Sequence, residues 1–140
     1  MEQKSEQPDM LTIRTMLAES GYAERAIDYY LNRPNEGPLD NPDHVTELTG
    51  PCGDTMKCYL KVRDGRIEDA KFQVLGCPGA VSAAMALADL ARGRTLGEAL
   101  EIKDQHVFRE LVDLPDQKQH CIRLSVKTLQ KAINEFAETH

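Results

Sequence analysis

The chain has 140 residues, of which 41% are hydrophobic and 29% charged, and its formal net charge is -6 at pH 7. A chain of this length can form one domain with a core of its own, and the composition is ordinary for a globular protein. The acidic balance, without grouped Lys and Arg, argues against nucleic-acid binding, because phosphates must be met by clustered cations. The polar start and the lack of a long apolar run argue against a signal peptide and a membrane span. We therefore expect a soluble, cytoplasmic protein.

Two helices and a loop are expected before any strand. Residues 1–21 form an N-terminal extension, with a frayed start and then a short helix that Asp9 is expected to cap. A second helix is expected over residues 22–33, where apolar side chains recur at helical spacing until Pro34 ends the run. The Gly- and Pro-containing residues 35–43 predict a loop that crosses the surface.

The hydrophobic period then changes to two, which indicates strands. Residues 45–49 predict a first strand, and residues 56–63 alternate between apolar and polar side chains, with Cys58 on the apolar side. Asp64-Gly65 is a strong signal for a hairpin turn, after which residues 69–74 alternate again as the returning strand. We expect an antiparallel sheet with one face open to water.

Helices are expected to follow the sheet. Residues 78–91 are rich in Ala and apolar nearly all round, which predicts a helix buried against the sheet. Thr95 has capping-box spacing to a glutamate and predicts a short helix near residues 96–100. Asp104 is expected to cap another helix that runs to Leu111.

From Cys121 onward, apolar residues at spacings of four and three predict one long C-terminal helix with a single apolar stripe. The expected fold class is therefore α+β, a three-stranded antiparallel sheet with helices packed around it and a long C-terminal helix.

Three of the four cysteines lie in turns or at a helix start. Cys52 stands between Pro and Gly just before a strand, Cys77 stands between Gly and Pro just after one, and Cys121 follows His120. Since a hairpin goes out and returns, Cys52 and Cys77 should reach the same end of the sheet. Cys77 and Cys121 should both sit at helix N-termini, where the dipole favours thiolate, the form that binds metals.

This set of side chains suits a metal. Three thiolates with His120 suit tetrahedral zinc, and the same thiolates with a carboxylate or histidine suit a [2Fe-2S] cluster. Asp54, two residues after Cys52, is a candidate oxygen ligand, although alone it would be an ordinary turn residue. Lys118 alone would be a solvated charge. The alternative, that cysteines are small core side chains, we adopt for Cys58.

An ordered set of motifs, from about residue 22 to residue 138, resembles the IscU/NifU N-terminal family of iron-sulfur cluster assembly scaffolds. The motifs are a tyrosine-led first helix with Asn32-Arg33-Pro34-Asn35 after it, Cys52-Gly53-Asp54, Gly76-Cys77, and Lys118 with His120-Cys121. The resemblance implies a scaffold domain over residues 22–140 with the α+β fold described above. It also implies that Cys52, Cys77 and Cys121 are cluster ligands and that Asp54 or His120 completes the set.

By this resemblance the protein is a scaffold or carrier and not an enzyme. A cysteine desulfurase supplies sulfur to Cys121 as a persulfide, a ferredoxin-type donor supplies electrons, and the [2Fe-2S] cluster passes to apo-proteins. Asp54 makes the cluster labile, because a hard oxygen is a poor match for it, and Lys118 is a further candidate for the chemistry.

Some features leave other functions open. Leu114-Pro115-Asp116-Gln117-Lys118 departs from the family's Leu-Pro-Pro-Val-Lys motif, which weighs against recognition by a DnaK-type chaperone. A second possibility is a zinc protein, either a structural domain or a zinc-dependent sulfur acceptor like SufU. A permanent electron-transfer cluster is disfavoured, since ferredoxins normally use four cysteines and Cys58 is expected in the core.

Overall fold

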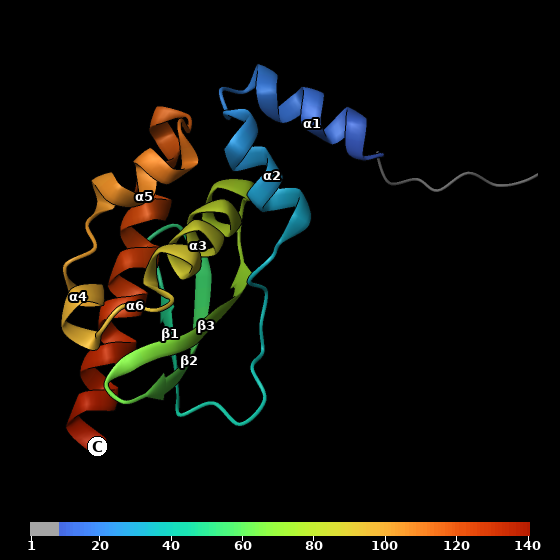
Figure 1. The fold of residues 1–140 in the computed structure, drawn as a ribbon. Helices are drawn as coiled ribbons and strands as arrows, with labels where there is room; N and C mark the ends of the chain where they lie inside the picture. The colour runs from blue at the N-terminus through green and yellow to red at the C-terminus, as the bar shows by residue number, and fades with distance from the viewer. Residues whose placement is uncertain (1–8) are drawn as a thin grey trace, which may run out of the picture.

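The computed structural model describes residues 9–140 as a three-stranded sheet with helices (Figure 1). The elements in chain order are α1 (Met10–Glu19), α2 (Glu24–Asn32), β1 (His44–Thr49), β2 (Thr55–Arg63), β3 (Arg66–Leu75), α3 (Pro78–Ala91), α4 (Leu96–Leu100), α5 (Asp104–Leu111), the 3-10 turn η1 (Asp116–Lys118) and α6 (Gln119–Thr139). The expected α+β class, with its long C-terminal helix, is confirmed.

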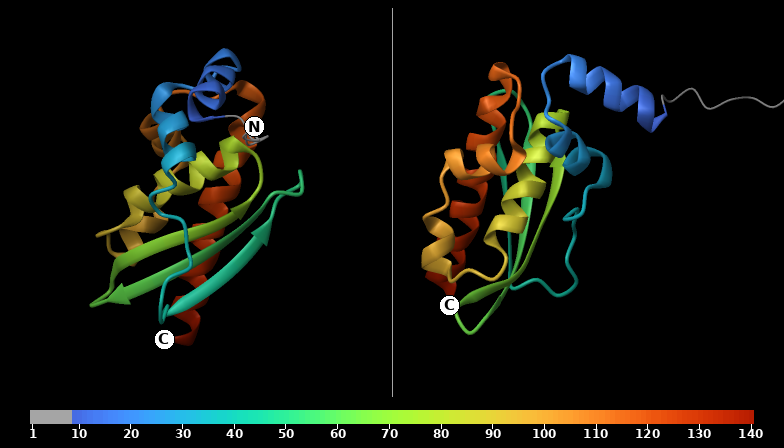
Figure 2. Two further views of the ribbon diagram at one scale, coloured as in Figure 1. Left: turned by 90° about the vertical axis from the view of Figure 1, so that its right-hand side faces the viewer. Right: turned by 45° about the horizontal axis from the view of Figure 1, so that its top comes forward.

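The strands lie in the order β1-β2-β3, and both pairs are antiparallel. Helices α3 and α6 pack side by side on one face of this sheet, with α3 against β3 and α6 against β1 and β2. Figure 2 shows this layering from two further directions, with the remaining helices beyond α3 and α6. The sheet thus has one covered face and one face turned away from the helices.

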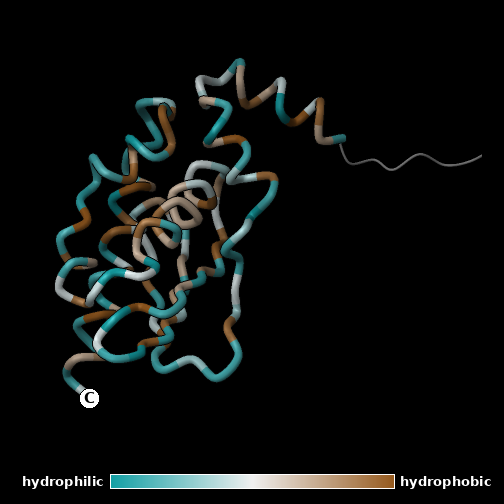
Figure 3. Tube along the Cα trace, in the orientation of Figure 1, coloured by the Kyte–Doolittle hydropathy of each residue, from teal (hydrophilic) through white to brown (hydrophobic). Residues whose placement is uncertain are grey.

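Helix α3 lies at the centre of the core. Alanines occupy six of its 14 positions and let the sheet, α2 and α6 approach it closely, so that most of its side chains are buried. In Figure 3 its trace is mostly pale to brown, in contrast to the teal surface loops. The prediction of a buried helix from Pro78 to Ala91 is confirmed, and the start of this buried helix fixes the position of Cys77.

The β2–β3 hairpin brings together the segment that holds Cys52 and the segment that holds Cys77. Asp64 and Gly65 have φ angles of 53° and 75°, the left-handed values that a tight hairpin turn requires. The strand register then sets Thr55 opposite Leu75. Because these residues end the ladder, the segments just before β2 and just after β3 must leave the sheet at the same end, as the sequence predicted.

The loop after α2 corrects one expectation about the open face of the sheet. The alternation in residues 56–63 places Tyr59 on the face of the sheet that we expect to be open to water, but only 8% of it is exposed. Residues 35–43 cross over it, and a Cβ added to Gly37 would lie 3.0 Å from the Tyr59 ring. The Gly37 amide donates to the Phe72 carbonyl at 2.8 Å, and the Phe72 amide donates to the Asn35 carbonyl at 3.0 Å. The loop is therefore held along the outer edge of β3.

Asn35 explains why this loop leaves α2 as it does. Its side chain is 4% exposed and donates to the Met85 carbonyl at 2.8 Å and to Asp89 Oδ1 at 3.0 Å. Its own amide oxygen accepts from Arg92 Nη2 at 2.7 Å. All three contacts are with α3 or its C-terminal cap, so the motif that ends α2 joins the loop to the central helix.

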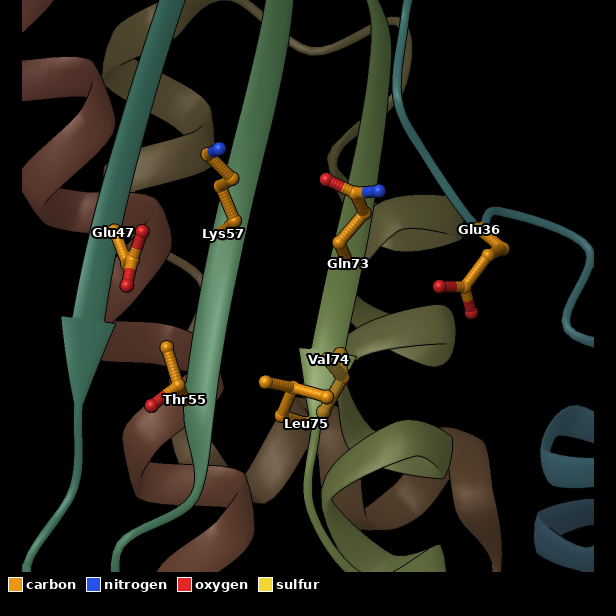
Figure 4. Close-up of a pocket in the computed structure, with 7 residues that line it drawn as sticks. All are labelled: Glu36, Glu47, Thr55, Lys57, Gln73, Val74 and Leu75. Carbon is orange, nitrogen blue, oxygen red and sulfur yellow. The ribbon is translucent and has the colours of Figure 1, made fainter.

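A shallow hollow of about 390 Å³ lies on the open face (Figure 4). Lys57 and Gln73 stand on neighbouring strands beside it, Glu36 borders it from the loop, and Leu75 lies at its end. The lining residues contain no cysteine or histidine, so the chemistry expected from the sequence belongs elsewhere.

Two helix caps agree with the sequence and one does not. Asp9 Oδ1 accepts from the Thr12 amide at 2.8 Å, and Thr95 and Glu98 form the reciprocal capping box. Asp104, however, is the first residue of α5 and not its cap. The cap residue is Lys103, and His106, at the third helical position, reaches back so that its Nδ1 accepts from the Lys103 amide at 2.9 Å.

Helix α1 projects from the rest of the fold and contacts α2 (Figure 1). It has no buried residue, and Arg14 ties it to Asp28 with a 2.9 Å ion pair. The expected short helix is therefore present, while the expected frayed start lies outside the described residues. In the described part of the chain, no helix is both long and apolar enough to cross a membrane.

Candidate metal and cluster site

Three candidate ligands meet at the end of the sheet where β2 begins and β3 ends. One ligand atom from each of Asp54, Cys77 and Cys121 lies within 4.8 Å of the others. The two sulfur atoms are 3.5 Å apart, and Asp54 Oδ2 lies 3.8 Å from Cys77 Sγ and 3.9 Å from Cys121 Sγ. Within residues 9–140 this is the only such group of His, Cys, Asp and Glu side chains.

Each member of this group comes from the edge of a regular element. Asp54 directly precedes β2, Cys77 is the N-cap of α3, and Cys121 lies in the first turn of α6. Helix α6 begins at Gln119, two residues earlier than the sequence indicated, because η1 leads directly into it. Rigid elements thus aim the three side chains, although Asp54 itself lies just outside its strand.

The structure places Cys52 and His120 outside the compact group. Cys52 is exposed on the turn before Asp54, where Gly53 has a φ of 90°. His120 is also exposed, with its Nε2 atom 3.6 Å from Cys121 Sγ. Cys58 has 0% exposure on the covered face of the sheet, as predicted. The site therefore has three gathered ligands and two candidates at its rim.

The two sulfurs lie close enough, at 3.5 Å, to form a hydrogen bond. The hydrogen bond from Cys121, helped by the Ala80 amide and the charge of Lys118, lowers the pKa of Cys77 to about 5. The same hydrogen bond, together with burial, raises the pKa of Cys121. The expectation that both helix-start cysteines favour the thiolate is thus wrong for Cys121. A sulfur 3.5 Å away, together with burial, outweighs the effect of the helix start at Cys121.

We expect iodoacetamide to react with Cys77 at a rate that stays nearly level from pH 8 to about pH 6. The rate should fall only as the pH drops through about 5, because the lowered pKa keeps Cys77 as thiolate above that value. Peptide mass spectrometry on the metal-free protein measures this rate. A tenfold fall for each pH unit below 8, as for an ordinary thiol, would contradict the lowered pKa.

Lys118 and Tyr22 also lie at the site. A Cβ added to Gly79 would lie 3.2 Å from Lys118 Cβ and 3.5 Å from Cys121 Sγ, so the glycine makes room for both. Burial and the nearby Cys77 and Cys121 raise the pKa of Tyr22 to about 12. The sequence marked Lys118 as a candidate. The sequence places Tyr22 only at the start of a predicted helix. Nothing in the neighbouring residues indicates that this tyrosine lies near Cys77 and Cys121 in the fold.

Residues 21–140 match the family model described as "NifU-like N terminal domain". The chain belongs to this family. A relative named "Iron-sulfur cluster assembly scaffold protein IscU 1", from Archaeoglobus fulgidus, is 39% identical over 116 residues, which are 82% of this chain and 76% of that protein. "Iron-sulfur cluster assembly scaffold protein IscU" of Escherichia coli is 38% identical over 120 residues, 82% of this chain and 93% of the relative.

Solved structures agree on the fold of this NifU-like domain. A nitrogen-fixing NifU-like protein (N-terminal) from Brucella abortus superposes with a TM-score of 0.71 at 20% identity, covering 94% of this chain and all of that one. The protein FiSufU from thermophilic Fervidobacterium islandicum gives a TM-score of 0.67 at 23% identity, over 80% of this chain and 96% of that one. At these identities the likeness concerns the fold alone.

The donors of this NifU-like domain fit a thiophilic metal. Two sulfurs and a carboxylate oxygen suit zinc or iron better than a hard ion such as magnesium, which binds oxygen ligands. A fourth donor is at hand in the exposed Cys52 or His120. This combination of three gathered ligands with two exposed donors at the rim is unlike a closed structural zinc site, which has four fixed ligands.

Proposed function

We propose that this chain is a scaffold on which an iron-sulfur cluster is assembled and from which the cluster is passed on. The observation that carries the proposal is the gathering of Asp54, Cys77 and Cys121 at one end of the sheet. Cys52 on the neighbouring turn completes three thiols, and His120 is the alternative to Asp54 as the fourth ligand. The names of the curated relatives support this function.

The first step is sulfur transfer from a cysteine desulfurase, with Cys121 as the acceptor. The Cys121 thiol gives up its proton and its sulfur attacks the outer sulfur of the donor's persulfide, which forms a new S–S bond. The bond between the two sulfurs of the donor persulfide breaks, and the donor's cysteine leaves as a thiolate that takes up the proton. Cys121 has 0% exposure, whereas Cys52 is exposed. The acceptor role therefore requires residues 114–121 to move outward before the desulfurase can reach this sulfur.

Cluster formation then needs electrons. Two sulfur atoms at the oxidation level of the persulfide take up four electrons to become two sulfides. Oxidation of two ferrous ions to ferric supplies two of these electrons, and a ferredoxin-type donor supplies the other two. The acceptor thiolate is regenerated when the S–S bond is reduced. The scaffold is thus a carrier and not an enzyme, since the cluster is its cargo.

Asp54 and Lys118 have separate roles in this proposal. Asp54 offers a hard oxygen where a cluster prefers sulfur, so it makes release possible. Lys118 lies against the start of α3, and its charge favours the thiolate forms of both gathered cysteines. A DnaK-type chaperone is not among the partners we propose, because Leu114 of the altered motif is packed in the core.

Anaerobic reconstitution tests the function. The metal-free protein is mixed with ferrous iron, cysteine, a cysteine desulfurase and a reduced ferredoxin, and its visible absorption is followed. A [2Fe-2S] spectrum that moves to an added apo-ferredoxin supports the scaffold. A colourless protein that retains zinc under the same conditions would favour the zinc-binding alternative.

Metal should order the ligand loops. We expect residues 51–54, 76–79 and 114–121 to exchange their amide hydrogens faster in the metal-free protein than with zinc bound, because metal binding is coupled to the folding of its ligands. The free energy of unfolding should rise by about 2.7 kcal/mol when free zinc is 100 times its Kd. Hydrogen-exchange mass spectrometry measures the loops one by one. Equal protection with and without zinc would remove this coupling.

A further inference from the structure

Two glycines in the ligand loops owe their identity to opposite causes. Gly53 has a φ of 90°, and a Cβ added to it would meet nothing within 4 Å. Its backbone conformation, and not space, therefore favours glycine. Gly76 has no left-handed φ, yet a Cβ there would lie 2.8 Å from Asp54 Cγ and 3.0 Å from Asp54 Oδ1. At Gly76 the backbone would accept alanine, but the space is already filled by the Asp54 carboxylate.

We propose that Gly76 is a positioning residue for the cluster site. Because Gly76 has no side chain, the Asp54 carboxylate can occupy the space beside it. In this position Asp54 Oδ2 lies within 3.9 Å of both Cys77 Sγ and Cys121 Sγ. The inference rests on the proposed function in that Asp54 is taken as a ligand. It adds that the place of this ligand is set by a residue with no donor atom of its own.

The carboxylate would yield to an added methyl group before the backbone did. Asp54 precedes β2, and its side chain can rotate toward solvent, whereas Gly76 is held between the end of β3 and the N-cap of α3. A second contact, 3.1 Å to Ala80 Cβ, would need a shift of a few tenths of an ångström. Gly76→Ala should therefore leave the fold intact, keep the thiols in place and remove the oxygen from the site.

The test is a double-mutant cycle read with cobalt(II), whose visible spectrum reports the donors around it. We expect the d–d bands of Gly76→Ala to match those of Asp54→Ala and to differ from wild type. In the Asp54→Ala background, Gly76→Ala should leave the bands unchanged, because the group that it displaces is gone. Cluster transfer to apo-ferredoxin should slow to the same extent in both single variants, because each loses the oxygen ligand that makes release possible.

Two control variants show whether a change in the cobalt spectrum of Gly76→Ala comes from displacement of Asp54 or from any glycine-to-alanine substitution. Gly97→Ala in α4 also has no left-handed φ and meets nothing within 4 Å, so its cobalt spectrum should be that of wild type. Gly76→Ala/Ala80→Gly removes the contact with Ala80 and should still give the spectrum of Asp54→Ala. If Gly76→Ala does not fold, the double variant Gly76→Ala/Asp54→Ala should fold, because without the Asp54 carboxylate there is room for the added methyl group.

The proposal is overturned if Gly76→Ala has the wild-type spectrum, if it alters the spectrum further in the absence of Asp54, or if the double variant with Asp54→Ala fails to fold. The cobalt measurement requires no cluster. If the wild-type protein builds no cluster while the cobalt spectra follow the expected pattern, the scaffold function fails and the role of Gly76 stands.

Discussion

Serine in place of Cys77 or Cys121 should abolish stoichiometric binding of both zinc and the [2Fe-2S] cluster. These two sulfurs lie 3.5 Å apart and form the centre of the gathered group, and a hydroxyl is a poor ligand for a thiophilic metal. We expect the zinc affinity to fall by more than about 100-fold, beyond the range for residues that only orient a ligand. Metal analysis after gel filtration and a competition titration measure the loss.

Cys52 and Cys58 complete this comparison. Cys52→Ser should also abolish stoichiometric cluster and zinc binding, because the third thiol comes from the exposed turn. Cys58→Ala should retain both and lose some stability, since it removes a fully buried sulfur from the core. A folded Cys58→Ala protein without metal would show that the ligands are wrongly assigned.

Asp54→Ala should trap the cluster on the scaffold. Removal of the weak oxygen ligand leaves three thiolates and allows His120, 3.6 Å from Cys121 Sγ, to take the fourth position. Because imidazole suits iron better than a carboxylate does, the cluster should survive longer in air and move more slowly to an apo-ferredoxin. The fold should be retained, as a turn aspartate rarely contributes more than about 1 kcal/mol.

Asp54→Asn is the matched control for shape. It keeps the size and hydrogen-bonding capacity of the side chain but removes the anionic oxygen. If Asp54 only shapes the turn, Asp54→Asn should behave like wild type in cluster half-life and transfer rate. If Asp54 is a ligand, Asp54→Asn should shift toward Asp54→Ala. Wild-type kinetics in Asp54→Ala would exclude Asp54 from the mechanism.

The sequence predicted those parts of the fold that short segments determine. The Asp64-Gly65 turn and the Thr95 capping box depend on a few neighbouring residues, and both were found. The helix that begins at Pro78 was equally clear, because its segment is rich in Ala and apolar nearly all round. In contrast, the burial of Tyr59 depends on a loop that returns from more than twenty residues away, and alternation along a strand contains no sign of such a cover.

In the candidate site, too, the sequence predicted what local motifs determine and missed what depends on distances between segments. Motifs in the chain indicated Cys77, Cys121 and Asp54, and the structure brings their ligand atoms together. It does not bring in Cys52 or His120, whose assignment as ligands stays a prediction. The raised pKa of Cys121 follows from its distance to another sulfur, a tertiary quantity that a helix-start pattern cannot supply. Tyr22 reaches the thiols for the same kind of reason.

The loop held along β3 also affects how this protein meets other chains. An uncovered strand at the border of a sheet can pair with a strand of another molecule and seed aggregates. Glu36 and Gly37 occupy that border through the bridge to Phe72. Of the two outer strands described, β1 is left with the open border. A segment of the chain itself thus occupies the border of one of the two outer strands at Phe72, where another molecule could otherwise pair.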